Sequence, residues 1–356
     1  MKPIYPLNVK NEFYFNSSAR DFTVEEIPLY EFTGEGEHLV LQVRKKDMTT
    51  WEMLDAISNH VGIRRRDMGY AGLKDKHAMT IQYISVMGIH EEKLKAFSHE
   101  KIKILSSVRH NNKIRVGHLR GNRFNIRLKK VLGVQKDKLD SVLKWIKKNG
   151  VPNYFGNQRF GTDGNNWEEG KKLLDGTLKM RDRKTKEFLM GSYQSYLFNK
   201  WLAKRMELNL LLEKFSEAET EQVMNLPEGS LKGTKAQPNF FKLVEGDVMM
   251  HYPYGRLFNV EDLAEESKRF ERKDIAPAGL LPGKKTKLAQ STAGLIEAPF
   301  VEEIALNGAR RYAWIQVTEI TKNYVEEKAH YELSFVLPKG CYATNVLDVL
   351  RGEPIK

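Results

Sequence analysis

The sequence predicts an α+β protein whose core domain, built on a mixed sheet, is made from both ends of the chain and carries an inserted domain. Strand-like alternation of apolar and polar residues is found near the start of the chain and again in about its last fifty residues. Helical periodicity predominates between about 165 and 225. Because the character of the sequence changes after Gly150, we expect core regions at 1–150 and 311–356 and an inserted domain at 151–310.

The first elements can be placed from the residues at their ends. Residues 38–44 alternate as a half-buried strand does. Thr49 and Glu52 have the spacing of a capping box, which predicts a helix over 51–61, and Gly62 follows as its C-terminal cap. A glycine-containing loop comes next.

Further strands and helices follow this loop. Strand character appears at 80–86, 102–108, 113–119, 122–128, 241–250, 312–320 and 331–337. Helices are expected at 137–149, 186–209 and 345–350. We also expect a turn at Arg120 and Gly121, and a loop over the Gly-, Pro- and Lys-rich residues 277–287.

Positive charge is concentrated in one stretch of the chain. Lys and Arg number 58 against 46 Asp and Glu, which gives a formal charge of +12. Residues 101–135 contain ten Lys and Arg and no acidic residue. Such a stretch favours a polyphosphate partner, because each neutralised phosphate releases counterions. The alternative is a solvated strand face balanced by carboxylates from elsewhere in the chain.

Several classes of protein are disfavoured. No apolar run reaches the ~20 residues of a membrane span, and the N-terminus has no secretory signal. The single cysteine, Cys341, rules out an intramolecular disulfide and a cysteine-rich zinc site. We therefore expect a soluble cytoplasmic protein. No obligate protein partner is evident, and the oligomeric state stays open.

The common cofactor motifs are also missing. Residues 278–286 resemble a phosphate-binding loop, but Ala278 replaces the first glycine and Lys285 stands where Ser or Thr is required. Gly34 and Gly36 lack the third glycine of a dinucleotide loop. The histidines show no metal-ligand spacing, and no serine-hydrolase elbow is present. Neither a cofactor nor a metal is expected.

The loop at 69–78 carries a candidate catalytic carboxylate. Asp75 lies between two lysines in sequence, and a nearby cation favours the ionised carboxylate. Lys74 and Tyr70 are candidates for contact with a substrate, and for Lys74 and Lys76 we favour phosphate contact. The alternative for Asp75 is a turn aspartate that bonds its own backbone.

Two further groups of side chains have the composition of an RNA-binding pocket. If 122–128 is a strand, Asn122 and Phe124 project from the same face, where an aromatic ring can stack on a base. The alternative is that Phe124 is simply core. Residues 153–161 place Phe155 and Arg159 among amides and glycines, as either an RNA pocket or an interdomain turn would.

The chain resembles the TruD family of tRNA pseudouridine synthases. The resemblance rests on GYAGLKDKHAMT, DFTVEEIPLYEFTGEGEHL, HLRGNRFNIRL, GVPNYFGNQRFG and LPKGCYATNVL, which occur in family order from residue 21 to about 350. It implies a permuted pseudouridine synthase core with a mixed, mainly antiparallel sheet and a family-specific α/β insertion domain beginning near Gly150. The implied reaction converts uridine, at position 13 of tRNA, to pseudouridine without a cofactor.

The resemblance also implies roles for individual residues. The catalytic aspartate of the family falls on Asp75, its stacking phenylalanine on Phe124 and the asparagine paired with the aspartate on Asn122. The family commonly has a lysine several residues before its DF motif. Here the stretch before Asp21 contains no lysine in that register, so Arg20 or another cation serves, or the lysine is not essential.

Two other functions are compatible with parts of this pattern. An RNA-binding protein without catalysis could use the same basic stretch. An RNA-modifying enzyme of another chemistry, such as a methyltransferase, would need a cofactor loop that the sequence lacks. The sequence also leaves open whether Asp75 attacks C1′ of the ribose or removes a proton from C2′.

Overall fold

The computed structural model describes residues 3–161, 163–252 and 255–355, which form two compact units. We call Asn11–Ser141 with Val317–Cys341 the sheet unit, and Met1–Lys10 with Val142–Gln316 and Tyr342–Lys356 the helical unit. These bounds do not coincide with residues 151 and 310, because 142–150, 311–316 and both chain ends group with the middle of the chain. The assignment of 151–310 as a family insertion stays a prediction.

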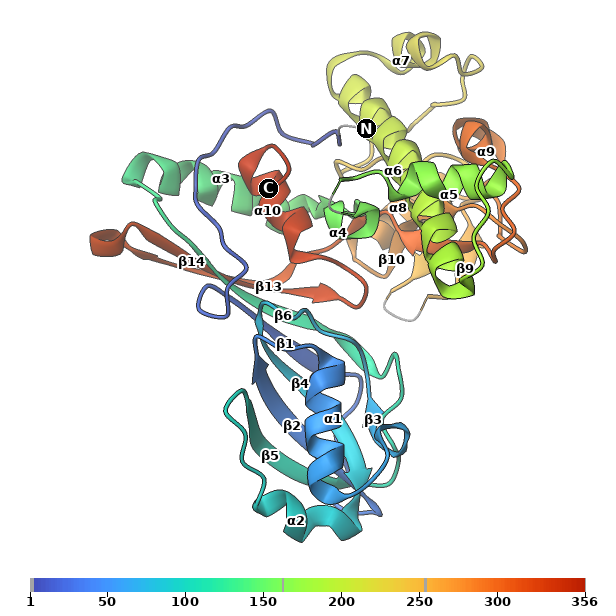
Figure 1. Ribbon diagram of the computed structural model, residues 1–356. Coiled ribbons are helices and arrows are strands. Elements are labelled where there is room, and N and C mark those ends of the chain that lie inside the picture. Colours follow the sequence, from blue (N-terminus) through green and yellow to red (C-terminus); the bar gives the residue numbers. More distant parts are fainter. Residues whose placement is uncertain (1–2, 162, 253–254, 356) are drawn as a thin grey trace. The chain divides into compact units, whose positions relative to one another are not determined.

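A mixed, mainly antiparallel sheet forms the centre of the sheet unit (Figure 1). Its strands are β1 (Phe22–Pro28), β2 (His38–Lys46), β3 (Gly69–Tyr70), β4 (Met79–Met87), β5 (Ile102–His110), β6 (Leu119–Leu128), β13 (Thr318–Val325) and β14 (His330–Pro338). Their order is β13-β14-β6-β1-β4-β2-β5, with β3 on β4. The β1–β4 pair is parallel and the other pairs are antiparallel. The α+β prediction is confirmed.

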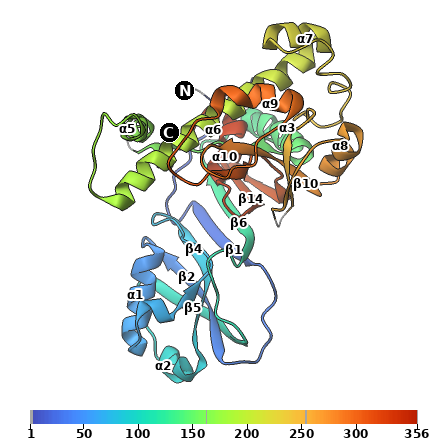
Figure 2. The ribbon, with the colours of Figure 1, turned by 90° about the vertical axis from the view of Figure 1, so that its right-hand side faces the viewer.

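Helix α1 (Thr50–Val61) covers one face of this sheet, over β2 and β4 (Figures 1 and 2). The predicted capping box is present, since the Thr49 hydroxyl accepts from Glu52 N–H and the Glu52 carboxylate accepts from Thr49 N–H. Gly62 ends the helix in the left-handed conformation, as expected. The apolar face of α1 packs on alternate residues of β2 in a common core.

One strand and one turn were predicted wrongly in the sheet unit. Residues 113–118 form a loop, and Gly121 lies inside β6, where a Cβ atom would approach the Leu337 carbonyl oxygen to 2.3 Å. The glycine therefore permits close approach of β14 and does not make a turn. Ile114 in the loop is buried, and its N–H donates to the Ser85 hydroxyl at 2.9 Å. Contacts distant in sequence override the local alternation here.

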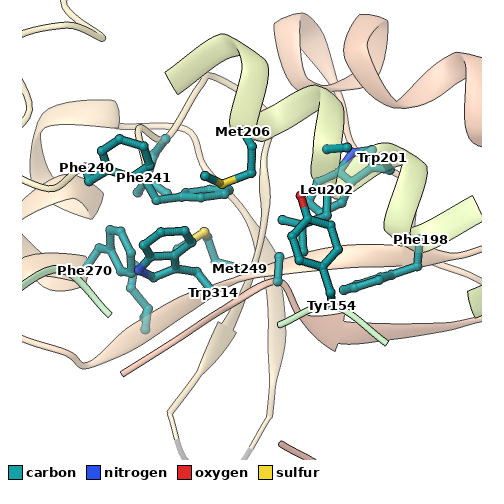
Figure 3. Close-up of a cluster of buried hydrophobic side chains, with 14 of the residues drawn as sticks. Tyr154, Phe198, Trp201, Leu202, Met206, Phe240, Phe241, Met249, Phe270 and Trp314 are labelled. Atoms are coloured by element: carbon teal, nitrogen blue, oxygen red, sulfur yellow. The ribbon is translucent and has the colours of Figure 1, made fainter. Parts of the chain in front are cut away.

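The helical unit is organised around α6 (Arg183–Lys214). Its other helices are α4 (Asn157–Phe160), α5 (Asn166–Leu174), α7 (Glu217–Met224), α8 (Leu263–Glu271), α9 (Ser291–Glu297) and α10 (Ala343–Arg351). Helix α3 (Gly133–Asn149) contains the boundary between the units, and α2 (Glu91–Lys95) belongs to the sheet unit. Figure 3 shows side chains of α6 in a buried cluster with Tyr154 and Trp314. The helices expected at 137–149, 186–209 and 345–350 are all present.

Short strands complete the helical unit. They are β7 (Val151–Pro152), β8 (Val248–His251), β9 (Leu257–Asn259), β10 (Ile275–Leu281), β11 (Ala309–Tyr312) and β12 (Trp314–Ile315). The loop predicted at 277–287 was wrong for its first half, which belongs to β10. At Gly279 a Cβ atom would lie 2.5 Å from the rings of Phe198 and Trp201, so the glycine serves close packing. The strand predicted at 241–250 is confirmed only at its end, in β8.

Candidate active site

Strand register places a row of side chains on the sheet face that α1 partly covers. Lys45 pairs with Thr80, Thr80 with Val24, Val24 with Phe124, and Phe124 with Phe335. Paired residues on neighbouring strands point to the same face. With strands ~4.8 Å apart, Lys45 and Phe124 are separated by three strand spacings, or about 14 Å.

The loop that carries Asp75 joins β3 to β4 and is fixed by its backbone. The Asp75 carbonyl oxygen accepts from Lys45 Nζ at 2.9 Å, and the Lys74 N–H donates to the Thr50 hydroxyl at 2.9 Å. Thr50 in turn donates to Gln82 Oε1 at 3.1 Å. The Asp75 side chain itself is exposed. The backbone of Asp75 is thus bonded inside the unit, while its side chain reaches the surface.

Lys74 forms a buried ion pair with Glu26. Its Nζ lies 2.6 Å from Glu26 Oε2, and the side chains are 6% and 1% exposed. Burial raises the pKa of Glu26, while Lys74 and the N–H of Tyr83 oppose that shift. Glu26 pairs with Asn122 across β1 and β6, so this ion pair brings the Asp75 loop to the strand that carries Asn122. Lys74 is engaged inside the unit, and of the two lysines Lys76 is the exposed one.

Lys45 was not singled out from the sequence. Its side chain is fully buried, and Nζ also donates to the Met48 carbonyl at 2.6 Å. Burial lowers the pKa of Lys45 to about 8, against the attraction of Asp75. The signal that could have found it is a lysine in phase with Leu39, Leu41 and Val43 on the inward face of β2.

Asn122 and Phe124 share one face of β6, as predicted from the alternation of residues 122–128. The Asn122 Oδ1 atom is buried, and within the described residues no donor reaches it. A buried acceptor without a donor is costly, which makes Asn122 a candidate to receive a hydrogen bond from a ligand. Phe124 is 5% exposed, with its ring 6.1 Å from Phe22 and 5.7 Å from Phe335. Phe124 is therefore part of the core, whatever else it does.

Tyr70 lies beside an exposed aromatic and basic surface. Its ring meets Trp51 edge to face at 5.3 Å, and Arg65 stacks over Trp51 at 4.8 Å. These residues line an open hollow of about 970 Å³ together with Arg64 and Arg66. Arg65 pairs with Asp55 in this hollow and Arg64 pairs with Asp67, so it is Arg66, beside the two aromatic rings, that suits a strand of RNA.

Phe155 and Arg159 lie in the helical unit, whereas Asp75, Lys74, Tyr70, Asn122 and Phe124 lie in the sheet unit. Arg311 stacks over the Phe155 ring at 4.1 Å. The Arg159 Nε donates to the Ser195 hydroxyl at 3.0 Å, and burial lowers the pKa of Arg159. Both residues thus contact other parts of the helical unit.

Part of the basic stretch at 101–135 is balanced by carboxylates. Arg109 pairs with Glu91, Arg123 with Glu319, and Arg127 with Glu332. Lys129 and Arg127 both approach the buried carboxylate of Asp21. The solvated-face alternative is therefore correct for these cations, and the exposed cations of this unit, such as Lys101 and Lys103, are the ones open to a phosphate.

No group of three or more His, Cys, Asp or Glu side chains among residues 3–161, 163–252 and 255–355 is arranged to hold a metal ion. In the same part of the chain, no helix combines the length and the apolar character needed to cross a membrane.

Comparison with known proteins identifies the family. The family model described as tRNA pseudouridine synthase D (TruD) matches residues 14–180 and 177–349. The chain is 53% identical over 346 residues to the tRNA pseudouridine synthase D of a Nitratiruptor species, covering 97% of this chain and 96% of the relative. It is 49% identical over 359 residues to that of Wolinella succinogenes, covering 100% and 99%.

A solved structure agrees with this result at the level of the fold. It is that of a TruD candidate from Methanosarcina mazei, with a TM-score of 0.71 at 21% identity, covering 99% of this chain and 96% of that one. The family model spans almost all of the chain, the relatives match it end to end, and the fold matches as well. The chain therefore belongs to the TruD family of tRNA pseudouridine synthases.

Proposed function

We propose that this member of the tRNA pseudouridine synthase family is an isomerase that converts uridine to pseudouridine at position 13 of tRNA, with Asp75 as its catalytic carboxylate. The observation that carries the role of Asp75 is its presentation: an exposed side chain on a loop whose backbone is held by Lys45 and, through Lys74, by Thr50 and Glu26. A loop backbone held in this way keeps the point from which the carboxylate extends in place while the substrate moves.

The reaction needs a carboxylate and no oxidant. The C1′–N1 bond of the uridine breaks, and the same uracil is joined again to C1′ through C5. Asp75 either attacks C1′ or removes a proton from C2′, and in both routes it must be ionised. The residues on this sheet face are compatible with both routes.

Asn122 and Phe124 are proposed to hold the detached base while it turns. Asn122 contributes an amide oxygen that has no donor among the described residues. Phe124 contributes a ring, and its 5% exposure means that a base can meet only the part of the ring that Phe22 and Phe335 leave uncovered. Stacking on an aromatic ring is compatible with rotation of the base, because it does not select one edge.

The target uridine must leave its stacked position, which costs a few kcal/mol. Contact with the RNA backbone has to offset this cost. In the sheet unit the hollow lined by Trp51, Tyr70 and Arg66 and the exposed Lys76 are proposed contacts. In the helical unit Phe155 and Arg159 remain candidates.

Asp75→Asn tests the catalytic role. It keeps the size of the side chain and removes the charge, so we expect conversion to fall by about 10³-fold or more while tRNA binding stays within about twofold. Pseudouridine is mapped at single-nucleotide resolution in tRNA treated with each variant, which also tests position 13. Asp137→Asn, at an exposed aspartate of the same unit paired with Lys136, is the matched control.

A variant Asp75→Asn that converts tRNA at the wild-type rate would show that the catalytic assignment is wrong. Retained binding with no conversion by any variant, wild type included, would favour the alternative of an RNA-binding protein. A requirement for an added methyl donor would favour the methyltransferase.

A further inference from the structure

Lys45 is a buried cation directly below the Asp75 loop. It extends from β2 on the face that carries Phe124, and its side chain is fully buried. Its Nζ donates to two backbone carbonyl oxygens, that of Met48 at 2.6 Å and that of Asp75 at 2.9 Å. Neither of these acceptors carries a charge.

A lysine in this position is an unfavourable choice for the fold alone. Its neighbours on the inward face of β2 are Leu39, Leu41 and Val43, and a buried charge without an opposite charge is costly. Among the described residues Lys45 is in no ion pair, unlike Lys74 on the same face. An apolar residue would fill the strand position at lower cost, so the ammonium group needs a reason beyond packing.

The charges around Lys45 come from several elements. Asp75 on the loop and Glu52 on α1 favour its ammonium form, and Lys74 opposes it. Lys76 and Lys101 are the cations near Glu52. Asp75 is the largest of the favourable charges, so its carboxylate favours the ammonium form of Lys45 across the loop backbone.

We propose that protonated Lys45 is a positioning residue for catalysis, which anchors the backbone of Asp75 and keeps a positive charge beneath its carboxylate. The inference rests on the proposed role of Asp75.

The protonation state of Lys45 then matters for the reaction. An ammonium group has three N–H donors and a positive charge, whereas a neutral amine has two N–H donors and no charge. Asp75 must be ionised in either route, and a nearby cation favours that form. Because burial lowers the pKa of Lys45 to about 8, the charge is present below that pH and is lost as the pH rises through it.

The first experiment compares Lys45→Met with Lys93→Met in the full-length protein. Methionine keeps most of the length and removes the charge and the donors. We expect kcat for Lys45→Met to fall about 100-fold, with the Kd for tRNA within about twofold, because a small displacement of a reactive group costs about that much. Lys93 also donates to a backbone carbonyl, that of Val61 at 3.0 Å, and Lys93→Met should keep wild-type kcat. Wild-type kcat in Lys45→Met would overturn the proposal.

The second experiment needs no variant to fold. The kcat of the wild-type enzyme is measured between about pH 6.5 and 9.0, under single turnover, with the pKa of Lys45 near the middle of the range. We expect the wild-type kcat to fall as the pH rises through about 8 and to approach the kcat of Lys45→Met. The kcat of Lys45→Met itself should not change over this pH range. The titration of Lys45 is followed in the same protein by the carbon-13 resonance of its side chain. A wild-type kcat that stays constant through that titration would overturn the proposal, even if Lys45→Met were unfolded.

Failure of this inference can be told apart from failure of the proposed function. If Asp75→Asn is inactive and Lys45→Met has normal kcat, Asp75 is catalytic and Lys45 does not position it. If Asp75→Asn is active, the catalytic assignment fails, and the inference about Lys45 fails with it.

Discussion

The helical unit pairs its buried arginines Arg205 and Arg310 with carboxylates, whereas the sheet unit, which pairs Lys74 with Glu26, holds a second buried lysine, Lys45, by carbonyl oxygens alone. In the helical unit Arg310 meets Glu297 at 2.5 Å and 2.6 Å through two nitrogens, and both side chains are almost fully buried. Arg205 forms a bidentate pair of the same kind with Asp247. In the sheet unit Lys45 is equally buried but is held by two carbonyl oxygens.

The paired arginines contribute to the stability of the fold, whereas the charge of Lys45 is the one that we propose to serve the catalytic site. A two-pronged arginine–carboxylate pair is neutral as a whole and directional, and its partners stay together in the low-dielectric interior. Lys45 leaves a net positive charge next to an exposed carboxylate, an arrangement that is more typical of functional sites.

Glu297→Gln should have the largest effect on stability. It leaves the Arg310 guanidinium buried without its counter-charge, so we expect the free energy of unfolding to fall by about 3–5 kcal/mol. Denaturant unfolding followed by circular dichroism measures this. Glu187→Gln removes an exposed pair with Arg183 in the same unit and should change the stability by less than about 1 kcal/mol. Equal losses for the two variants would contradict the structural role given to the buried pair.

Phe124→Leu should separate the core role of this ring from its proposed role in catalysis. Leucine fills most of the buried volume, so we expect a stability loss of less than about 1.5 kcal/mol. Loss of the ring face should lower kcat by about 10- to 100-fold, because base stacking contributes about 1–3 kcal/mol. Phe335→Leu, in the neighbouring ring, is the control for packing. If both variants lose stability and neither loses kcat, Phe124 is core alone.

The pH dependence of stability should reveal the buried charge of Lys45. Its pKa is lowered to about 8 in the folded state, so between that pH and the ordinary lysine value the unfolded chain binds more protons. Stability attributable to Lys45 therefore rises with pH in this range, by about 1 kcal/mol per pH unit. The difference in unfolding free energy between the wild type and Lys45→Met, measured at several pH values, isolates this slope. A constant difference would mean that Lys45 titrates normally.

Sequence reasoning worked best where short-range signals coincide. Thr49 and Glu52 cap the start of α1, and Gly62 caps its end. Both caps form between residues close in sequence, so they need no distant partner. The alternation of residues 122–128 correctly placed Asn122 and Phe124 on one face of β6. The position of Asp75 on the loop between β3 and β4 also followed from the sequence.

The failures have a common cause, which is pairing between distant segments. Apolar and polar side chains alternate over residues 113–118 as they do in a strand. These residues nevertheless form a loop, in which the Ile114 N–H donates to the Ser85 hydroxyl. Gly121 has the composition of a turn, but its role depends on β14, more than two hundred residues later. Similarly, residues 277–281 have the composition of a loop, but they belong to β10, because α6 and β11 pack against them.

The family, the candidate carboxylate at Asp75 and the pair Asn122 and Phe124 can be identified without a structure, because they depend on motifs and on local periodicity. The residues that hold the backbone of Asp75 in place can be identified only from the fold. Glu26 and Lys45 come from strands β1 and β2, and their meeting with the Asp75 loop depends on strand order and register, which one sequence does not reveal. The sequence thus identifies Asp75 as a candidate, and the fold brings together the residues that fix its loop.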